Sequence, residues 1–139
     1  MEKITFDAGV KSYRINGGAL LKFNPADPNL YARFLEAVEK IKGLEKELEL
    51  TDGKQALEVM CQADQKIKSL LGWVFGNGND FDALLGGVNL LAAATNGQRV
   101  ITNLLQALLP VIADGAKMCA GMQAEQAAQK AKTRREAVC

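Results

Sequence analysis

The side chains that most often perform chemistry in small proteins are scarce in this sequence. Histidine is absent, and serine occurs only as Ser12 and Ser69. Without an imidazole there can be no His-dependent catalytic triad, no general base of that kind near neutral pH and no His-ligated metal. No paired acids and no activated thiol are evident, so the sequence predicts a protein that is not an enzyme.

Three cysteines are the other candidates for chemistry: Cys61, Cys119 and Cys139. They are odd in number and widely spaced, with no CxxC pair, which is typical of reduced thiols rather than of a disulfide framework or a zinc site. Cys61 and Cys119 stand among apolar residues at helical spacing, which favours a packing role. We therefore expect no metal and no cofactor.

A run of oxygen-bearing side chains in the middle of the chain could attract a cation. The run comprises Asn77, Asn79, Asp80 and Asp82. It lacks the spacing at positions 1, 3 and 5 and the distal Glu of a calcium loop. Asp80 is instead expected to cap a short helical turn over residues 81–85, after the glycines at 76 and 78 have ended a helix.

The elements that must position these residues begin with a predicted β-hairpin over residues 4–24. Apolar side chains alternate along it, and the Asn-Gly-Gly at 16–18 supplies the positive φ that a tight turn needs. A three-residue connection at 17–19 would put four apolar side chains on one face. The expected cross-strand pairs are Ile15 with Leu21 and Tyr13 with Phe23. An isolated hairpin is marginal in water, so this face should pack on the following helices or the hairpin should pair with another subunit.

The first predicted helix begins at Pro28. Asp27 can accept backbone hydrogen bonds as the N-cap, and proline at the first helical position loses no bond. An apolar stripe with charged residues on the other face continues to about Leu50. Gly43 lowers helix propensity inside this segment and predicts either a bend or a close approach of another element.

The second predicted helix begins at residue 53, after a short turn. Asp52 and Gln55 have the spacing of a capping box, and the short connection favours an antiparallel helical hairpin. Asp64 is the anomaly in this helix, because it falls on the apolar stripe. We expect it to lie at the edge of the stripe or to pair with Lys68, one turn away.

The third predicted helix begins at residue 97 with a broad apolar stripe. Pro110 should kink this helix, unless the helix stops just before it. Gly115 lowers helix propensity near the C-terminal part of the chain, whereas the Ala-rich residues 116–132 favour helix. Basic side chains outnumber acidic ones over residues 117–139, which is typical of a mobile, solvated tail.

Composition bounds the class of protein. Of the 139 residues, 48% are hydrophobic and 24% are charged, which is enough for one domain with a core. The formal net charge of +1 gives no global attraction for nucleic acid or for an anionic membrane. The first residues lack the apolar region of a signal peptide, and no stretch reaches 18 uncharged apolar residues. We expect a soluble intracellular protein without a membrane span, whose partner is a protein.

Together these patterns predict an α+β fold, a mostly helical single domain with an N-terminal β-hairpin. The domain covers residues 1–115, with the hairpin at 4–24 and helices from 28, 53 and 97. Residues 116–139 are expected to form an Ala-rich, basic C-terminal helix or tail.

Three segments, taken in order, carry a resemblance. They are FNPADPNLYARF at residues 23–34, VFGNG at 74–78 with LGG at 85–87, and NLLQALLP at 103–110. Across roughly residues 4–115 the chain resembles the tail assembly chaperones of long-tailed phages and of prophages in Gram-positive bacteria. The resemblance implies a non-enzymatic phage tail assembly chaperone that coats helical segments of the tape-measure protein, self-associates into an oligomer or a spiral, and leaves before the tail tube closes. It also implies action in the host bacterial cytoplasm and absence from the mature virion.

Large apolar side chains at such a surface are the expected partner contacts, because aromatic residues are favoured anchors. The candidates are Leu30, Tyr31, Phe34, Trp73, Phe75 and Phe81. For each of them packing in the core is the competing interpretation, and it is strongest for Phe34.

A small helical DNA-binding or regulatory protein is the alternative function. Against it, the positive charge gathers at the C-terminal end rather than on a recognition helix. Arg99 is the only basic residue between Ser69 and Gly115.

Overall fold

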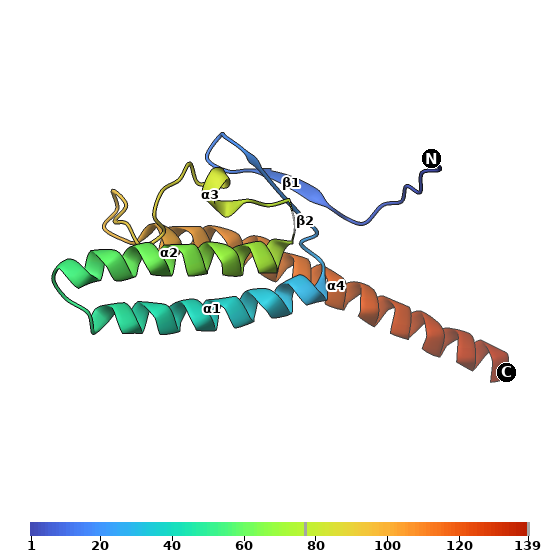
Figure 1. Ribbon diagram of the computed structural model, residues 1–139. Helices are drawn as coiled ribbons and strands as arrows, with labels where there is room; N and C mark the ends of the chain where they lie inside the picture. The colour runs from blue at the N-terminus through green and yellow to red at the C-terminus, as the bar shows by residue number, and fades with distance from the viewer. Residues whose placement is uncertain (77, 139) are drawn as a thin grey trace.

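The computed structural model describes the backbone of residues 1–76 and 78–138 and the side chains of these residues up to 134. A β-hairpin is followed by two antiparallel helices, a short helix and a long C-terminal helix. The elements are β1 Lys11–Arg14, β2 Leu20–Phe23, α1 Pro28–Glu49, α2 Lys54–Phe75, α3 Phe81–Leu84 and α4 Val100–Val138. This is the predicted mostly helical α+β fold with its N-terminal hairpin. Figure 1 shows α4 running behind α1 and α2, with the hairpin and α3 on the side of α2 away from α1.

The hairpin is shorter than predicted and has a different register. Residues 1–10 form no strand, and Tyr13 pairs with Leu21 instead of Phe23. Ile15 donates its N–H to Ala19 O at 3.0 Å, so the three-residue connection lies at 16–18 rather than 17–19. Asn16 and Gly17 take the positive φ there, +48° and +73°. A shift of two residues keeps every side chain on its face, so the predicted apolar face is retained despite the wrong register.

A row of aromatic rings joins the hairpin to the helices. Tyr13 stacks on Phe23 with ring centroids 4.8 Å apart, Phe23 meets Phe75 edge-on at 4.8 Å, and Phe75 lies 5.4 Å from Phe81. These contacts bring together β1, β2, α2 and α3, and pairs of this kind stabilise a core beyond the area they bury. The hairpin face is therefore covered by helices of the same chain.

Helix α1 begins as the sequence predicts, but α2 does not. Asp27 accepts a hydrogen bond from Asn29 N at 2.9 Å, and Pro28 is the first helical residue. The N-cap of α2 is Gly53, with φ +67° and no side-chain cap, so the predicted Asp52 capping box is absent. The turn requires a positive φ at residue 53, which favours glycine. The C-terminal end of α2 is capped by Arg33, whose Nε and Nη2 donate to Val74 O at 3.1 and 3.0 Å.

Helix α4 is continuous through Pro110 and begins at Val100 instead of residue 97. Its first N–H groups find carbonyl partners in the preceding loop, Val100 N with Ala92 O at 3.0 Å and Ile101 N with Leu90 O at 2.8 Å. Up to Gly115 the helix contributes to the core, whereas all its side chains from 121 to 134 are exposed. This part leaves the body and points into solvent (Figure 1).

By length and composition alone, the Val100–Arg134 part of α4 could cross a membrane. A single helix of this kind is weak evidence for a span. Helix α4 buries Ile101, Leu108 and Ile112 in the core, although only 17% of the tested stretch is buried. The segment therefore carries little weight in assigning a location.

Candidate interaction groove

Four of the six candidate partner contacts are buried inside the fold. Leu30, Phe34, Phe75 and Phe81 are 2%, 1%, 6% and 3% exposed. The apolar stripes of α1 and α2 face each other, α4 and the hairpin, so these side chains form the core and are removed from the set of surface contacts. Tyr31 and Trp73 are exposed, at 38% and 46%, and remain available to a partner.

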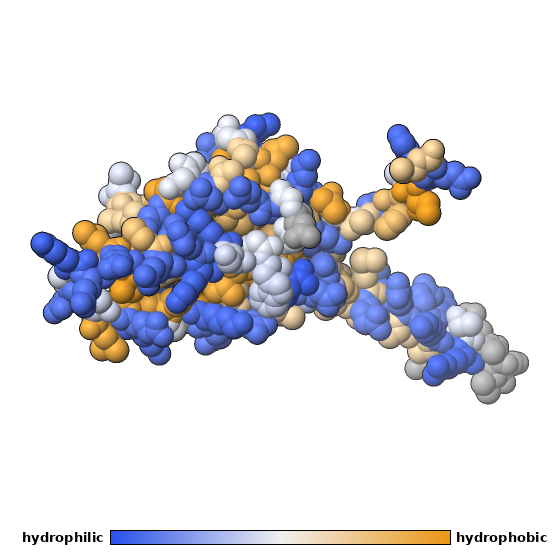
Figure 2. Space-filling model, in the orientation of Figure 1, coloured by the Kyte–Doolittle hydropathy of each residue, from blue (hydrophilic) through white to orange (hydrophobic). Residues whose placement is uncertain are grey.

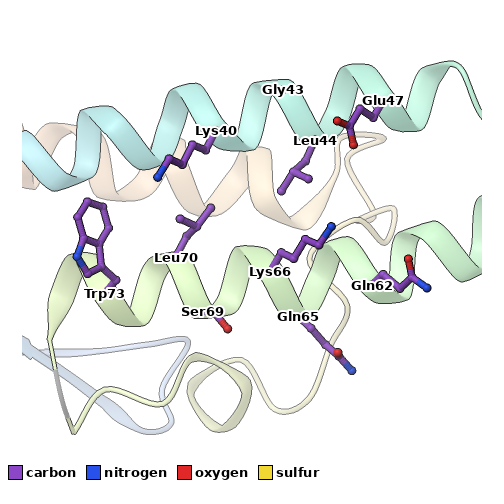
Figure 3. Close-up of a pocket in the computed structure, with 10 residues that line it drawn as sticks. All are labelled: Lys40, Gly43, Leu44, Glu47, Gln62, Gln65, Lys66, Ser69, Leu70 and Trp73. Atoms are coloured by element: carbon purple, nitrogen blue, oxygen red, sulfur yellow. The ribbon is translucent and has the colours of Figure 1, made fainter.

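Trp73 lies at one end of an open groove between α1 and α2 (Figure 3). The groove has a volume of about 800 Å³. The residues around it come from two helices: Lys40, Gly43, Leu44 and Glu47 from α1, and Gln62, Gln65, Lys66, Ser69, Leu70 and Trp73 from α2. In Figure 3, Leu44 and Leu70 point into the space between the helices. The apolar centre with a charged and amide rim has the composition of a protein-binding surface.

Two features of the sequence shape this groove. Gly43 has no side chain, and a Cβ built on it would meet no atom within 4 Å, so the wall of α1 is open at this position. The Nζ of Lys40 lies 5.7 Å from the centre of the Trp73 ring, a cation–π contact that orients the indole. The prediction of a close approach at Gly43 is wrong. What the glycine contributes is space beside Leu44.

Tyr31 lies in a second groove, formed by the start of α1 and the middle of α4. This groove has a volume of about 660 Å³ and is lined by Pro28, Tyr31, Ala113, Ala116, Lys117, Cys119, Ala120 and Gln123. It does not include Trp73. The two exposed candidates therefore belong to separate surfaces and can be tested independently.

Asp64, the acidic anomaly of α2, holds the loop before α4. It is 9% exposed, and its Oδ2 lies 2.9 Å from Lys68 Nζ, which confirms the predicted pair. Its Oδ1 accepts a hydrogen bond from Leu90 N at 2.8 Å. Lys68 Nζ also lies 2.6 Å from Oδ1 of Asp82, a residue of α3. Both oxygens of the buried Asp64 carboxylate are therefore paired, as a buried charged group requires.

Because the pKa of Lys68 is raised in the folded chain, the free energy of unfolding depends on pH in the alkaline range. Burial, the largest single influence, lowers this pKa, but hydrogen bonds and charges of Asp82 and Asp64 outweigh it and raise the pKa above its ordinary value. The folded chain therefore holds this proton more tightly than the unfolded chain. The stabilisation is complete below the ordinary lysine pKa of about 10.4 and is lost as the pH rises through the raised folded pKa.

We expect the free energy of unfolding of the wild type to fall more steeply above about pH 10.4 than that of Lys68→Met. Urea unfolding measured from about pH 9 to pH 12 checks this slope. Lys66→Met, which removes an exposed lysine from the same helix, is the control and should keep the wild-type slope. Parallel curves for Lys68→Met and the wild type would contradict the linkage.

The oxygen-rich run is used for local structure. Asp80 Oδ1 accepts from Asp82 N at 3.1 Å and Ala83 N at 3.4 Å, so the predicted cap of α3 is confirmed. Asn77, also in this run, lies outside the described residues. Within the described parts of the chain, no group of three or more His, Cys, Asp or Glu side chains could hold a metal ion.

Asn79 has a role that sequence reasoning missed. Its Oδ1 accepts from Lys22 N at 3.0 Å, and its Nδ2 donates to Lys22 O at 2.8 Å and to Phe75 O at 3.1 Å. The carboxamide thus occupies the outer edge of β2 as a neighbouring strand would, and it joins that edge to the end of α2. Because the partner is 57 residues away, no local pattern could have found it.

The comparisons with known proteins add no relative. No family model matches the chain, no curated protein matches it, and no solved structure matches it. Any function must therefore be inferred from the residues and from their geometry.

Proposed function

We propose that this protein is a non-enzymatic phage tail assembly chaperone. It binds helical segments of the tape-measure protein, self-associates during tail morphogenesis, acts in the host cytoplasm and is absent from the finished virion. The resemblance of the three sequence segments suggested this function. The kind of partner that fits this function is an amphipathic helix with large apolar side chains on one face.

The observation that carries the proposal is the open groove between α1 and α2. A partner helix lying along it could place apolar side chains against Leu44, Leu70 and Trp73. Lys40, Lys66 and Glu47 at the rim would meet its polar flanks. Leu44 and Leu70 in the groove are only partly buried, so a partner helix can reach them from the solvent side.

Trp73→Ala tests the groove. We expect it to weaken binding of tape-measure fragments about 30-fold, the effect of losing a large aromatic anchor. Stability should change little, since nearly half of the side chain is already exposed. Trp73 is the only tryptophan, so its fluorescence in the wild type should shift when a fragment enters the groove. Titration followed by fluorescence, with calorimetry for the variant, gives both affinities.

Leu57→Ala is the matched control, because Leu57 is an exposed apolar residue of the same helix, at 67%, and does not line the groove. It should bind as the wild type does. If Tyr31→Ala weakens binding and Trp73→Ala does not, the partner uses the groove beside α4. If no tape-measure fragment stays soluble or binds on co-expression, the chaperone function is wrong, and a salt-dependent gel shift would favour DNA binding instead.

A further inference from the structure

The N-terminal arm, residues 3–8, has the pattern of a strand but no strand partner within the part of the chain that the structure describes. Apolar Ile4, Phe6 and Ala8 alternate with polar Lys3, Thr5 and Asp7. Ile4 and Phe6 are 91% and 77% exposed. Figure 1 shows the arm leaving the body, and Figure 2 shows apolar side chains gathered on it. An exposed apolar strand pattern of this kind marks a site of association.

The place where the arm leaves the fold is held by specific contacts. Asn24 Nδ2 donates to Ala8 O at 3.0 Å, and Gly9 N donates to Asp7 Oδ1 at 2.8 Å. Gly9 has φ +74°, and a Cβ there would lie 2.6 Å from Asn24 Nδ2, so the side chain of Asn24 lies close against the backbone at this residue. Since β2 ends at Phe23, opposite Lys11, the hairpin offers no partner to the residues before 11. The arm is directed away from its own sheet.

We propose that the arms of two copies pair as antiparallel strands, with Thr5 on the two-fold axis. This register places Thr5 opposite Thr5, Ile4 opposite Phe6 and Lys3 opposite Asp7 of the second copy. Thr–Thr, aromatic with β-branched, and opposite-charge pairs are the cross-strand pairs that stabilise antiparallel sheets. All apolar side chains then share one face of the ribbon, and the interface is the same on both copies.

Neighbouring registers lack this complementarity. Centring the pair on Phe6 leaves Lys3 opposite Gly9, and centring it on Asp7 places two carboxylates opposite each other. Centring it between two residues sets polar side chains opposite apolar ones. Charge and hydrophobic pattern therefore select the Thr5 register.

The paired arms are small compared with the roughly 1,200–2,000 Å² that stable interfaces bury, so the dimer should form and dissociate readily. The pairing of the arms rests on the proposed function in one respect: it specifies how the self-association proposed above takes place. Its tests use the isolated full-length chain, whereas the groove is tested with tape-measure fragments. Failure of one leaves the other standing.

Disulfide trapping tests the register. With Cys61, Cys119 and Cys139 replaced by serine, Thr5→Cys should cross-link to itself under mild oxidation. Lys3→Cys and Asp7→Cys should cross-link when mixed but not alone, because equal positions would be about 13 Å apart, beyond the reach of a disulfide. Equal cross-linking of all three variants, or none at Thr5→Cys, would overturn the proposal.

Charge reversal tests the pairing without cysteine. Lys3→Asp sets Asp opposite Asp7, and Asp7→Lys sets Lys opposite Lys3, so each variant alone should dimerise about tenfold more weakly than the wild type in low salt. A one-to-one mixture of the two variants restores both charge pairs and should form a heterodimer in analytical ultracentrifugation. A mixture that associates no better than its components would refute the pairing, since a defect in folding would not be repaired by mixing.

Discussion

Gly115→Ala is expected to destabilise the protein by about 3 kcal/mol and to lower its melting temperature by roughly 10 °C. A Cβ at residue 115 would lie 1.8 Å from Pro25 O and 2.4 Å from Pro25 C, both of them backbone atoms. No rotamer change can relieve that contact, so α4 must move away from the connection between β2 and α1. The clash outweighs the gain of about 1 kcal/mol that alanine brings to a helix. Thermal and urea unfolding followed by circular dichroism measure the loss.

Gly43→Ala is the matched control within α1. The chemical change is the same, but a Cβ at residue 43 meets nothing within 4 Å. We expect this variant to be more stable than the wild type by about 0.5–1 kcal/mol, from helix propensity alone. If Gly43→Ala and Gly115→Ala change the free energy of unfolding in the same direction, the close approach of α4 to Pro25 does not govern the effect at residue 115.

Asp64→Ala is expected to cost about 3 kcal/mol, because it removes one partner of a buried ion pair and leaves Leu90 N without its acceptor. Hydrogen exchange of the Leu90 amide should become much faster than in the wild type, because this bond ties the loop before α4 to α2. Urea unfolding gives the global loss, and exchange measured by NMR gives the local one.

Two variants separate charge from hydrogen bonding at this site. Asp64→Asn keeps an acceptor for Leu90 N and should lose less stability than Asp64→Ala. Asp82 is the exposed partner of Lys68, and the Asp82 side chain is 65% exposed. Asp82→Asn should therefore lower the free energy of unfolding by less than about 1 kcal/mol. Equal losses for Asp64→Ala and Asp82→Asn would contradict the role assigned to Asp64.

Much of the fold could be predicted from local signals. The cap at Asp27 with Pro28, the end of α2 at Gly76 and the cap at Asp80 depend on a few neighbouring residues, and the structure has all three. The hairpin register was wrong by two residues. Both registers put the same side chains on the apolar face, so periodicity alone could not choose between them.

The candidate site was harder to predict. Large apolar residues on amphipathic helices are natural candidates for partner contacts, but four of the six are buried by elements distant in sequence. Trp73 differs from Phe75, two residues later, because the first faces the open side of the α1–α2 pair and the second faces the hairpin. The groove itself is lined by residues of two helices, among them Gly43 of α1 and Leu70 of α2, which are far apart in the sequence.

By itself, the sequence determined the hairpin and the helices and the single-domain fold class, and it offered the pairing of Asp64 with Lys68 as one of two alternatives. These features depend on backbone preferences, periodicity and contacts one helical turn away. Only the tertiary structure decided that Gly115 marks a close approach while Gly43 opens a groove, and that Asn79 completes the edge of β2. Each of these cases depends on whether a segment far along the chain packs against the residue, which is set by how the whole core packs.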